Sequence, residues 1–525
     1  MISQHLISIL ATLPFISTFH QPPWLSLNQE ALSFLAATIA FISLRKIKIS
    51  KYILVTYISL ITTIILQYIF IPSVSLEKSS IYIIYSSLCL TAYTYTYNLK
   101  FSNTDIANLT KILSLYIFFS VLVSCGIAFR QILNIDNSFF ETTFSGNRAY
   151  ANIRQPNLFA TFIVIGLCSL YHIKNTYRIS STTTVICSTL LSLALVTTQS
   201  TIGILSFIAV HSLIATKAPP HKKIKILAFI LMTALLFKLY PYIYSHFHES
   251  TALINRSSTN GRVVLYSFFT SLIQNSLFFG YGIGSIKSAQ FKHIDLLSSE
   301  SIEVTSYTHN LFLDFAIWFG LPIAGILLAI IIILSIKKLK HYLTKTTNNK
   351  TYNYFLLIYI SIGLHSLVEY PHAYSFYLIL FFFAAGATTT TTESQFNISK
   401  KVKFSFTAIF VTVLYITYND YQIIKENIKQ DTYNIGKIDI QTNPRDIESV
   451  ILLQDLKTRH ILTINTPETI ASTYTKKEIL SFIESFPDYT LITKASLALT
   501  VQGNNIEAND LSRRKNKLYG STYKK

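Results

Sequence analysis

Charged residues are scarce in this chain of 525 residues: they make up 13% of it, against about a quarter of a typical soluble protein. Hydrophobic residues make up half of the chain and gather in runs of 15 to 27 residues. A helix needs about 20 such residues to cross the hydrocarbon core of a bilayer. The scarcity of charge therefore argues against a large soluble helical protein and predicts an integral membrane protein that crosses the bilayer many times.

Cysteines and the common catalytic motifs are also scarce or missing. The four cysteines, Cys89, Cys125, Cys168 and Cys187, fall inside apolar runs and form no C-x-x-C pair, so no disulfide framework is predicted. The chain has no Walker A loop, no H-E-x-x-H, no G-x-S-x-G elbow and no D-x-D in an exposed loop. These absences disfavour an ATP-driven pump and a metal-dependent sugar transferase. The N-terminus lacks the basic region of a signal peptide, so the first apolar run is expected to be a retained anchor.

The formal net charge of +19 could suggest binding to nucleic acid, but its distribution points elsewhere. From Asp420 to the C-terminus there are 15 Lys and Arg against 13 Asp and Glu, so most of the excess lies in residues 1–419. There it occupies short loops between apolar runs, which is the positive-inside signature of membrane topology. No nucleic-acid partner is predicted.

Thirteen apolar segments are predicted to span the membrane. They cover residues 6–20, 30–44, 53–72, 80–97, 111–132, 157–173, 181–198, 202–216, 226–244, 309–335, 353–369, 374–390 and 404–418. Segments 6–20, 202–216 and 404–418 are only 15 residues long, so the predicted number of spans is 11–13.

Lysine and arginine divide the connecting loops into two sets. One set of alternate loops carries 20 basic residues: Arg45, Lys46, Lys48, Lys51, Lys100, Lys111, Lys174, Arg178, Lys217, Lys222, Lys223, Lys225, Lys337, Lys338, Lys340, Lys345, Lys350, Lys400, Lys401 and Lys403. The opposite set carries Lys78, Arg130, Arg148, Arg154, Arg256, Arg262, Lys287 and Lys292. The richer set is predicted to be cytoplasmic, which places the N-terminus inside and, with thirteen spans, the C-terminal tail outside.

The outer polar segments are where chemistry is expected. They are loop 133–156, the turn at Gln199 and Ser200, the long loop 245–308, the turn 370–372 and the tail. Long structured loops are more often functional than merely connecting. The tail shows helical periodicity at 447–456 and 477–483, and 495–508 looks like a helix, a turn and a second helix. A small α-helical C-terminal domain is therefore predicted.

Two outer motifs carry groups suited to proton transfer and anion binding. Tyr307-Thr-His309-Asn310 stands where the long loop enters segment 309–335, and a neutral histidine there could accept a proton. On local sequence alone, a histidine that anchors the start of a helix is the favoured alternative. Asn260-Gly-Arg262, with Arg256 nearby, offers guanidinium groups that bind phosphate oxygens. Gly280-Tyr-Gly-Ile-Gly284 follows no clear strand, which disfavours a nucleotide site and leaves a plain turn as an alternative.

Two further outer motifs carry amides, an acid and histidines. Asn152-Ile-Arg154-Gln155-Pro156-Asn157 leads into segment 157–173; its amides suit sugar hydroxyls, although helix capping explains it completely. His365-Ser-Leu-Val-Glu369-Tyr370-Pro-His372 lies between two segments. Acidic and histidine side chains cost free energy at the edge of a membrane, so their presence there suggests a function. Glu369 could be a general base, a partner for an arginine or an acid at the headgroup level. His365 with Glu369 falls short of a zinc ligand set. The sequence offers no explanation for Asp314, an acid inside a predicted span.

Taken in order, these motifs resemble the O-antigen ligase superfamily and, within it, the bacterial protein O-oligosaccharyltransferases that glycosylate pilins (the PglL type). The resemblance covers about residues 145–390, and no single motif is specific, whereas the ordered set is. It is carried by Asn152-x-x-Gln155-Pro156-Asn157, Thr198-Gln-Ser200, Gly261-Arg262 ahead of Gly280-x-Gly-x-Gly284, His309-Asn310-Leu-Phe-Leu-Asp with Gly320-Leu-Pro, and His365-Ser-Leu-Val-Glu369-Tyr-Pro.

The resemblance implies an all-α polytopic membrane protein of the bacterial inner membrane, with its active site facing the periplasm. The expected fold has about 13 transmembrane helices, a long periplasmic loop and a small α-helical C-terminal domain. The expected domains are the N-terminal transmembrane helices (1–144), a ligase-like transmembrane core (145–390) with periplasmic loop 245–308, a last transmembrane helix (391–418) and a C-terminal α-helical periplasmic domain (419–525).

The resemblance also implies transfer of a whole glycan from a polyprenyl (undecaprenyl) diphosphate lipid to a Ser or Thr hydroxyl of a pilin-like protein. No nucleotide sugar, metal or cofactor is expected. His309 would remove the proton of the acceptor hydroxyl, and Arg262 would bind the diphosphate and stabilise the leaving group. Glu369 and Tyr370 would shape the outer rim. The expected substrate-binding residues are Arg154, Gln155, Asn157, Arg256, Asn310, Glu369 and Tyr370.

Two positions depart from the family's pattern. Family members usually have an arginine after Thr-Gln-Ser, where this chain has Thr201; Arg130, Arg148 or Arg154 could replace it. The ligase pattern has a small residue where this chain has Ile323, which argues against a strict lipopolysaccharide ligase. The alternatives are a ligase that attaches O-antigen to lipid A–core, an O-antigen polymerase and, outside this class, a lipid or solute transporter.

Overall fold

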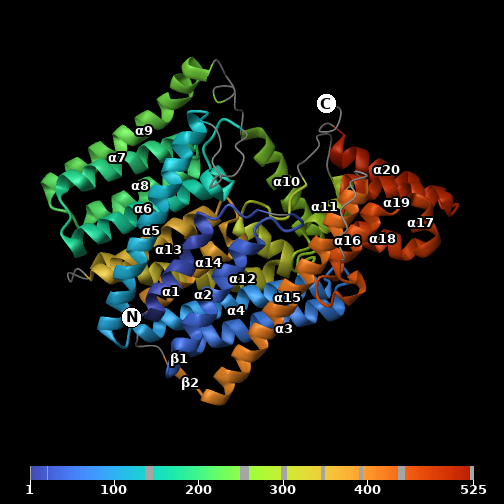
Figure 1. The fold of residues 1–525 in the computed structure, drawn as a ribbon, viewed down its shortest axis with the longest axis horizontal. Coiled ribbons are helices and arrows are strands. Elements are labelled where there is room, and N and C mark those ends of the chain that lie inside the picture. Colours follow the sequence, from blue (N-terminus) through green and yellow to red (C-terminus); the bar gives the residue numbers. More distant parts are fainter. Residues whose placement is uncertain are drawn as a thin grey trace. The chain divides into compact units, whose positions relative to one another are not determined.

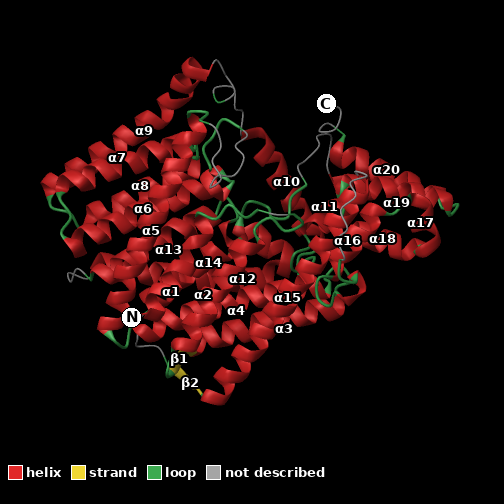
Figure 2. Ribbon diagram, viewed as in Figure 1, coloured by secondary structure: helices red, strands yellow, loops and turns green. Residues whose placement is uncertain are grey.

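The structure, a computed structural model, describes residues 2–20, 22–135, 146–248, 253, 259–296, 304–344, 349–389, 394–435 and 444–520. Helices make up nearly all of its regular structure (Figure 2), and the strands β1 (Ile47–Ser50) and β2 (Gln395–Ile398) have four residues each. The all-α prediction is therefore confirmed for the described residues.

The chain forms two compact units, each assembled from three stretches of sequence. Unit 1 comprises Met1–Val55, Ser87–Ser257 and Ile331–Thr407; unit 2 comprises Thr56–Ser86, Ser258–Ile330 and Ala408–Lys525. Four helices run from one stretch into the next: α3 (Lys51–Phe70), α4 (Leu76–Leu99), α12 (Leu311–Thr344) and α15 (Lys400–Ile435).

Besides these helices and the two strands, unit 1 is built from short and long helices. They are α1 (Ile2–Thr12), η1 (Leu13–Phe15), α2 (Leu27–Ser43), α5 (Asn103–Ile132), η2 (Ala151–Ile153), α6 (Pro156–Tyr177), α7 (Ser181–Thr197), α8 (Thr201–Thr216), α9 (Pro220–His248), α13 (Lys350–Ser366), η4 (Pro371–Ala373) and α14 (Ser375–Thr388).

Helix α6 is the buried centre of unit 1. Every residue from Leu158 to Leu170 is buried, and the helix packs against α5, α7, α8 and α13 (Figure 1). A helix that is apolar on all sides is expected to be surrounded in this way. Gly166 allows α5 to approach closely, because a Cβ at this position would lie 2.7 Å from Val121 Cγ1. In the apolar part of α6, 83% of the residues are buried inside the chain, against 6% in α9.

The two strands join the ends of three helices in unit 1. β1 pairs antiparallel with β2, with Ile47 opposite Ile398. Asn98, at the end of α4, donates to Lys48 O at 2.7 Å and accepts from Lys48 N at 2.8 Å, which covers the other edge of β1. At the start of α15, Lys403 Nζ donates to Ile42 O at 2.7 Å and thereby satisfies a carbonyl at the end of α2.

Unit 2 combines parts of the long helices α3, α4, α12 and α15 with a set of smaller helices. Its further elements are α10 (Thr259–Asn275), α11 (Ile286–Lys292), η3 (Ile294–Leu296), η5 (Ile447–Ser449), α16 (Gln454–Ile464), α17 (Pro467–Thr473), α18 (Lys476–Ser485), α19 (Tyr489–Val501) and α20 (Asn505–Tyr519).

Helix α12 is interrupted at Gly320, a break that was not predicted in segment 309–335. Gly320 has φ 75° and ψ 165°, a conformation that is essentially restricted to glycine. The free carbonyls before the break accept hydrogen bonds from the glycine motif: Tyr281 N donates to Ile317 O at 2.7 Å and Gly282 N to Trp318 O at 3.1 Å. Residues 280–284 therefore form a turn packed on the break in α12.

After α15, four helices pack around α19, namely α16, α17, α18 and α20. The predicted helical stretch 447–456 is wrong in its first part, where only the short η5 forms. The buried Asp420 carboxylate accepts hydrogen bonds from the N–H groups of Ile451 at 3.0 Å and Leu453 at 3.1 Å, and also from that of Leu452. These are the donors that a helix starting at residue 447 would need, so α16 begins only at Gln454.

The start of α4, before the predicted span 80–97, holds α16 through half-buried polar groups. Leu456 N donates to Glu77 Oε2 at 3.0 Å, and Ser75 Oγ donates to Asp455 Oδ2. Lys78 Nζ donates to Ser73 O at 3.0 Å. Burial, reinforced by the nearby Asp455 carboxylate, raises the pKa of Glu77 to about 8. Glu77 is therefore largely protonated at neutral pH, and its carboxyl acts as an acceptor for the start of α16.

Each of the thirteen predicted segments overlaps a helix, although in segment 6–20 the helical residues end at Phe15. Among the described residues, six helices are long and apolar enough to cross a bilayer: α3, α5, α6, α9, α12 and α15. This composition agrees with a multi-pass membrane protein. Thirteen crossings remain a prediction.

Candidate active site

The predicted site residues fall into two groups, one in each unit. Arg154, Gln155, Asn157, Glu369 and Tyr370 lie in unit 1, whereas Arg262, His309 and Asn310 lie in unit 2. Arg256 lies outside the described residues.

In unit 1, three side chains from distant parts of the sequence form a hydrogen-bonded series. Arg148 Nη2 donates to Asn157 Oδ1 at 2.8 Å, and Asn157 Nδ2 donates to Glu369 Oε1 at 2.8 Å. The Glu369 side chain belongs to a residue that is only 2% exposed. A buried carboxylate is costly without partners, and Asn157 links it to a guanidinium group. We call Arg148, Asn157 and Glu369 the polar relay.

Arg148 also contacts the turn between α7 and α8, which contains the Thr-Gln-Ser motif. Its Nε donates to Thr198 O at 2.7 Å. In this turn, Gln199 has a φ of 46°, and Ser200 Oγ accepts from Gly203 N at 3.1 Å to cap α8. The guanidinium of Arg148 is thus placed beside the motif whose expected arginine is replaced by Thr201. Of the three arginines considered from sequence, Arg148 is the one with a hydrogen bond to this turn among the described contacts.

Gln155 and Arg154 shape the entry into α6. Gln155 Oε1 accepts from Leu158 N at 2.6 Å, so its side chain caps the helix, and Pro156 occupies the first turn. Arg154 has a φ of 63° and an exposed side chain. Gln155 therefore caps α6, which the capping account of this motif did not assign to it, whereas the amide of Asn157 belongs to the polar relay.

The motif that follows α13 divides its polar groups between two partners. His365, fully buried, shares a 2.7 Å hydrogen bond between its Nδ1 and Thr161 Oγ1 of α6. Glu369 instead joins Asn157, at the start of the same helix. Tyr370 is half-buried, and its ring stacks on that of Tyr374 with centroids 6.4 Å apart. His365 and Glu369 thus attach the end of α13 to α6 at two points.

In unit 2, His309 stands two residues before the start of α12 in a strained conformation. Its φ is 61°, which is uncommon for a residue other than glycine and is often found at functional sites. Asn310 Oδ1 accepts from Phe312 N at 2.9 Å and from Leu313 N at 3.3 Å, so this amide oxygen caps α12. The side chain of His309 is half-buried.

Asp314, the acid with no explanation from sequence, holds the residue before His309. Its Oδ1 accepts from Thr308 N at 2.7 Å, and both residues are 0% exposed. Thr308 Oγ1 in turn donates to Asn310 O at 2.9 Å and accepts from Asn310 N at 3.2 Å. Residues on both sides of His309 are therefore fixed, which sustains its left-handed backbone. The signal in the sequence was an acid inside a predicted span, five residues after His309.

Helix α10 connects His309 with Arg262. Tyr266 Oη donates to His309 O at 3.2 Å. Arg262 precedes Tyr266 by four residues on α10, so the two side chains lie on one face of the helix, one turn apart. Arg262 is exposed. The two residues predicted to be catalytic, 47 positions apart in the sequence, are thus linked through one side chain in unit 2.

These groups offer complementary chemistry. A half-buried imidazole with a fixed backbone can take a proton from a hydroxyl, and an exposed guanidinium on a neighbouring helix can bind an anionic leaving group. In unit 1, the polar relay supplies a second guanidinium held by a carbonyl and an amide. No group of three or more His, Cys, Asp or Glu side chains suited to a metal ion occurs within the described ranges.

Three family models match parts of the chain. They are described as "Virulence factor membrane-bound polymerase, C-terminal" (residues 353–525), "O-Antigen ligase" (186–330) and "Protein glycosylation ligase" (149–171). The short third match contains Arg154, Gln155 and Asn157. The second match contains Arg262, His309 and Asn310, and the first contains Glu369 and Tyr370.

Two proteins of Acinetobacter baylyi are similar to this chain. A ComP-specific O-oligosaccharyltransferase is 29% identical over 293 residues, which cover 54% of this chain and 52% of that protein. A general O-oligosaccharyltransferase is 25% identical over 397 residues, which cover 71% of this chain and 67% of that protein. The match thus spans about half the length of the first relative. These findings confirm the predicted resemblance to the O-antigen ligase superfamily and, within it, to protein O-oligosaccharyltransferases.

Proposed function

We propose that this chain is a protein O-oligosaccharyltransferase. It moves a glycan as one block from a polyprenyl (undecaprenyl) diphosphate carrier to a Ser or Thr hydroxyl of a pilin-like protein, without a metal or cofactor. The reaction takes place at the periplasmic face of the bacterial inner membrane. The similarity to two O-oligosaccharyltransferases and the polar chemistry of the predicted outer face support this proposal.

The observation that carries the proposal is the link from α10 to His309. Tyr266 holds the main chain of His309, and Arg262 lies one turn away on the same helix face. A group-transfer reaction of this kind needs a base for the acceptor and a cation for the leaving group. A transporter would not require a strained histidine and an exposed arginine at this place.

The proposed step is an inverting displacement. His309 takes the proton of the acceptor hydroxyl while the acceptor oxygen forms a bond with the anomeric carbon of the glycan. The bond between that carbon and the diphosphate oxygen breaks, and the polyprenyl diphosphate leaves with the electron pair. Arg262 binds the departing diphosphate, so its contact strengthens as negative charge develops on the bridging oxygen.

The polar relay of unit 1 is proposed to serve the lipid-linked donor. Arg148 takes the place of the arginine that is missing at Thr201, because it contacts the Thr198 carbonyl of the same turn. Asn157 and Glu369 hold its guanidinium in one orientation. Arg154, with its exposed side chain, and Tyr370 contribute to substrate binding, and the same role is proposed for Arg256 and Asn310.

A second candidate function is a glycan polymerase that joins repeat units on the lipid carrier. The match of residues 353–525 to the C-terminal region of membrane-bound polymerases favours it. A polymerase would use the same donor and the same leaving group, but its acceptor hydroxyl would belong to another lipid-linked glycan. The identity of the acceptor therefore separates the two functions.

The test is to produce the full chain in a bacterial host that makes a lipid-linked glycan and a pilin-like acceptor. Intact-protein mass spectrometry should show the acceptor shifted by the mass of one glycan. His309→Ala should remove the shifted species, whereas His246→Ala, at an exposed position near the end of α9, should retain it. An unmodified acceptor together with longer lipid-linked glycans would establish the polymerase instead. Full activity of His309→Ala would refute the assignment of the base.

A further inference from the structure

A cavity lies at the end of unit 1 where β1 meets the ends of α2 and α4. Its volume is about 450 Å³, within the range of small-ligand sites. Three basic residues line it, Arg45, Lys46 and Lys48, and Asp105 is the one acid among its lining residues. The loops that supply these cations belong to the lysine-rich set, which is predicted to be cytoplasmic. The cavity is thus far from the outer motifs in the predicted topology.

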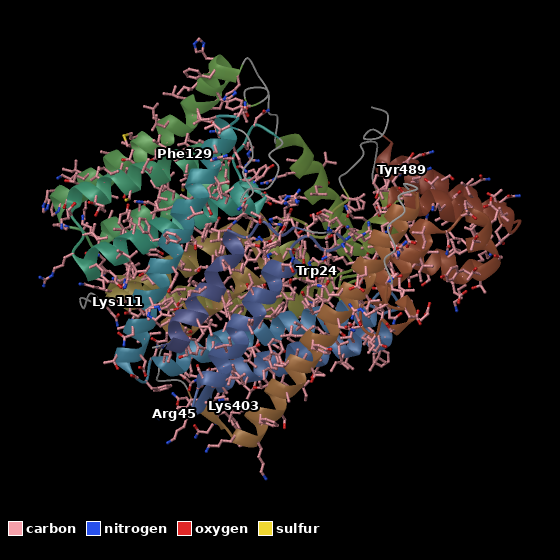
Figure 3. The ribbon with its side chains drawn as sticks, in the orientation of Figure 1. Trp24, Arg45, Lys111, Phe129, Lys403 and Tyr489 are labelled. Carbon is pink, nitrogen blue, oxygen red and sulfur yellow. The ribbon has the colours of Figure 1, made fainter. Side chains whose placement is uncertain are left out.

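Main-chain groups around this cavity form hydrogen bonds with side chains other than those of Arg45, Lys46 and Lys48. The carbonyls of Ile42 and Leu44 at the end of α2 accept hydrogen bonds from Lys403 Nζ at 2.7 and 2.5 Å, so a different lysine serves as the helix cap. Figure 3 shows Arg45 and Lys403 at the same end of the unit. Asn98 satisfies the main chain of Lys48. The side chains of Arg45 and Lys46 are exposed.

Apolar side chains continue from the cavity onto the neighbouring surface. Phe101, which lines it, is 44% exposed and lies under Lys48, with 4.5 Å between Nζ and the ring centroid. Ile42 at the end of α2 is 51% exposed. Val402 and Phe404, on either side of Lys403, are 56% and 76% exposed. A cationic hollow beside exposed aliphatic and aromatic groups fits a molecule with a phosphate head and an acyl tail better than it fits a free phosphate.

We propose that this cavity binds the headgroup of an anionic phospholipid of the cytoplasmic leaflet. The phosphate would lie among Arg45, Lys46 and Lys48, and the acyl chains would follow the apolar side chains at the ends of α2 and α15. Basic hollows between helices on the cytoplasmic side are suited to such headgroups, because each nearby Lys or Arg attracts an anionic surface. The site is independent of the glycan-transfer proposal, since it requires only that the chain resides in a membrane with its lysine-rich loops on the cytoplasmic side.

The experiment uses the full-length protein in neutral detergent, with dioleoyl phosphatidylglycerol as the probe and native mass spectrometry as the readout. The R45Q/K46Q variant removes two exposed charges at the cavity. The matched control K222Q/K223Q removes two exposed charges at the start of α9, on the same predicted side. Phosphatidylglycerol binding should fall at least about tenfold in the cavity variant and stay within about twofold of wild type in the control. Lys48→Gln alone should give an intermediate loss.

Three results would overturn the proposal. Equal losses in both double variants would mean that attraction to the general positive charge explains the binding. Binding of phosphatidylcholine as strong as that of phosphatidylglycerol would mean that the phosphate charge is not recognised. Displacement of the lipid by equimolar inorganic pyrophosphate would mean that the cavity takes a free phosphate. Thermal unfolding of each variant in the same detergent verifies that R45Q/K46Q remains folded, and both altered side chains are exposed, so its midpoint should match that of wild type.

Discussion

The break in α12 makes Gly320 a position where one added methyl group should have a large effect. In Gly320→Ala the new Cβ would lie 2.3 Å from Phe278 O and 2.4 Å from Phe278 C, far inside contact distance. The φ of 75° and ψ of 165° add about 1–3 kcal/mol of backbone strain for any residue with a Cβ. Because the clash is with main-chain atoms, the turn itself must move.

That movement would also weaken hydrogen bonds around the break. Leu321 N donates to Leu277 O at 2.7 Å, and Tyr281 N donates to Ile317 O at 2.7 Å. Each such bond contributes about 1 kcal/mol net. Together with the strain, we expect Gly320→Ala to lower the free energy of unfolding by at least about 3 kcal/mol. Glycan transfer should fall as well, since the first half of α12 carries Asp314 and follows His309.

The measurement is thermal unfolding of the purified protein in detergent, with Gly325→Ala as the matched control. Gly325 lies in the same helix, and no atom outside its local helix lies within 4 Å of a Cβ added there. Because alanine favours a helix by up to about 1 kcal/mol over glycine, Gly325→Ala should unfold at the wild-type temperature or above it. Indistinguishable midpoints for the two alanine variants would refute the reasoning, since it assigns opposite effects to the same chemical change.

Three further predictions concern polar contacts. The pKa of Glu77 is raised from an ordinary 4.5 to about 8, so the folded state binds more protons than the unfolded state between these values and stability falls as pH rises through that window. We expect the free energy of unfolding to be lower at pH 9 than at pH 6 by an amount on the order of a few kcal/mol, which a lower thermal midpoint at pH 9 would show. Glu77→Gln should reduce this difference; an unchanged pH dependence in the variant would contradict it. Tyr266→Phe deletes the hydrogen bond to His309 O and should slow transfer about fivefold at saturating substrate with little change in KM, as measured by acceptor glycosylation over time. Arg148→Lys should lower transfer about tenfold, because an ammonium group cannot hold Thr198 O and Asn157 Oδ1 with the geometry of a guanidinium; wild-type rates in this variant would show that the polar relay is not needed.

The positions of the helices could be predicted because the length and polarity of an apolar run are local properties. Every predicted segment overlaps a helix for this reason. The failures arise where distant residues decide the local structure. Asp420 takes the N–H groups of residues 451–453 and prevents a helix from starting at 447, and no local pattern records that contact. The break in α12 left a weak signal, since Gly320 stands two residues before Pro322.

The candidate site was predictable in its residue types and not in its connections. His309 and Arg262 came from ordered motifs, but the role of Tyr266 depends on how α10 packs beside α12. Arg130, Arg148 and Arg154 were equivalent candidates in the sequence, because each is an arginine of the predicted outer face. Among the contacts described for this part of the chain, the hydrogen bond from Arg148 to Thr198 O singles out Arg148.

The contrast between α6 and α9 has a consequence for how this sequence can change over evolution. Both helices have hydrophobic sequences. In the apolar part of α6, however, 83% of the residues are buried inside the chain, whereas in that of α9 only 6% are. A lipid tail adapts to any aliphatic surface, so exchanges among Leu, Ile, Val and Phe on α9 should be nearly silent. On α6 the neighbours are fixed side chains such as Val121 against Gly166, and a single extra methylene has no room. A saturation-mutagenesis survey should therefore find that α6 tolerates few substitutions that change side-chain size or shape. In α9 it should find that any apolar side chain is tolerated.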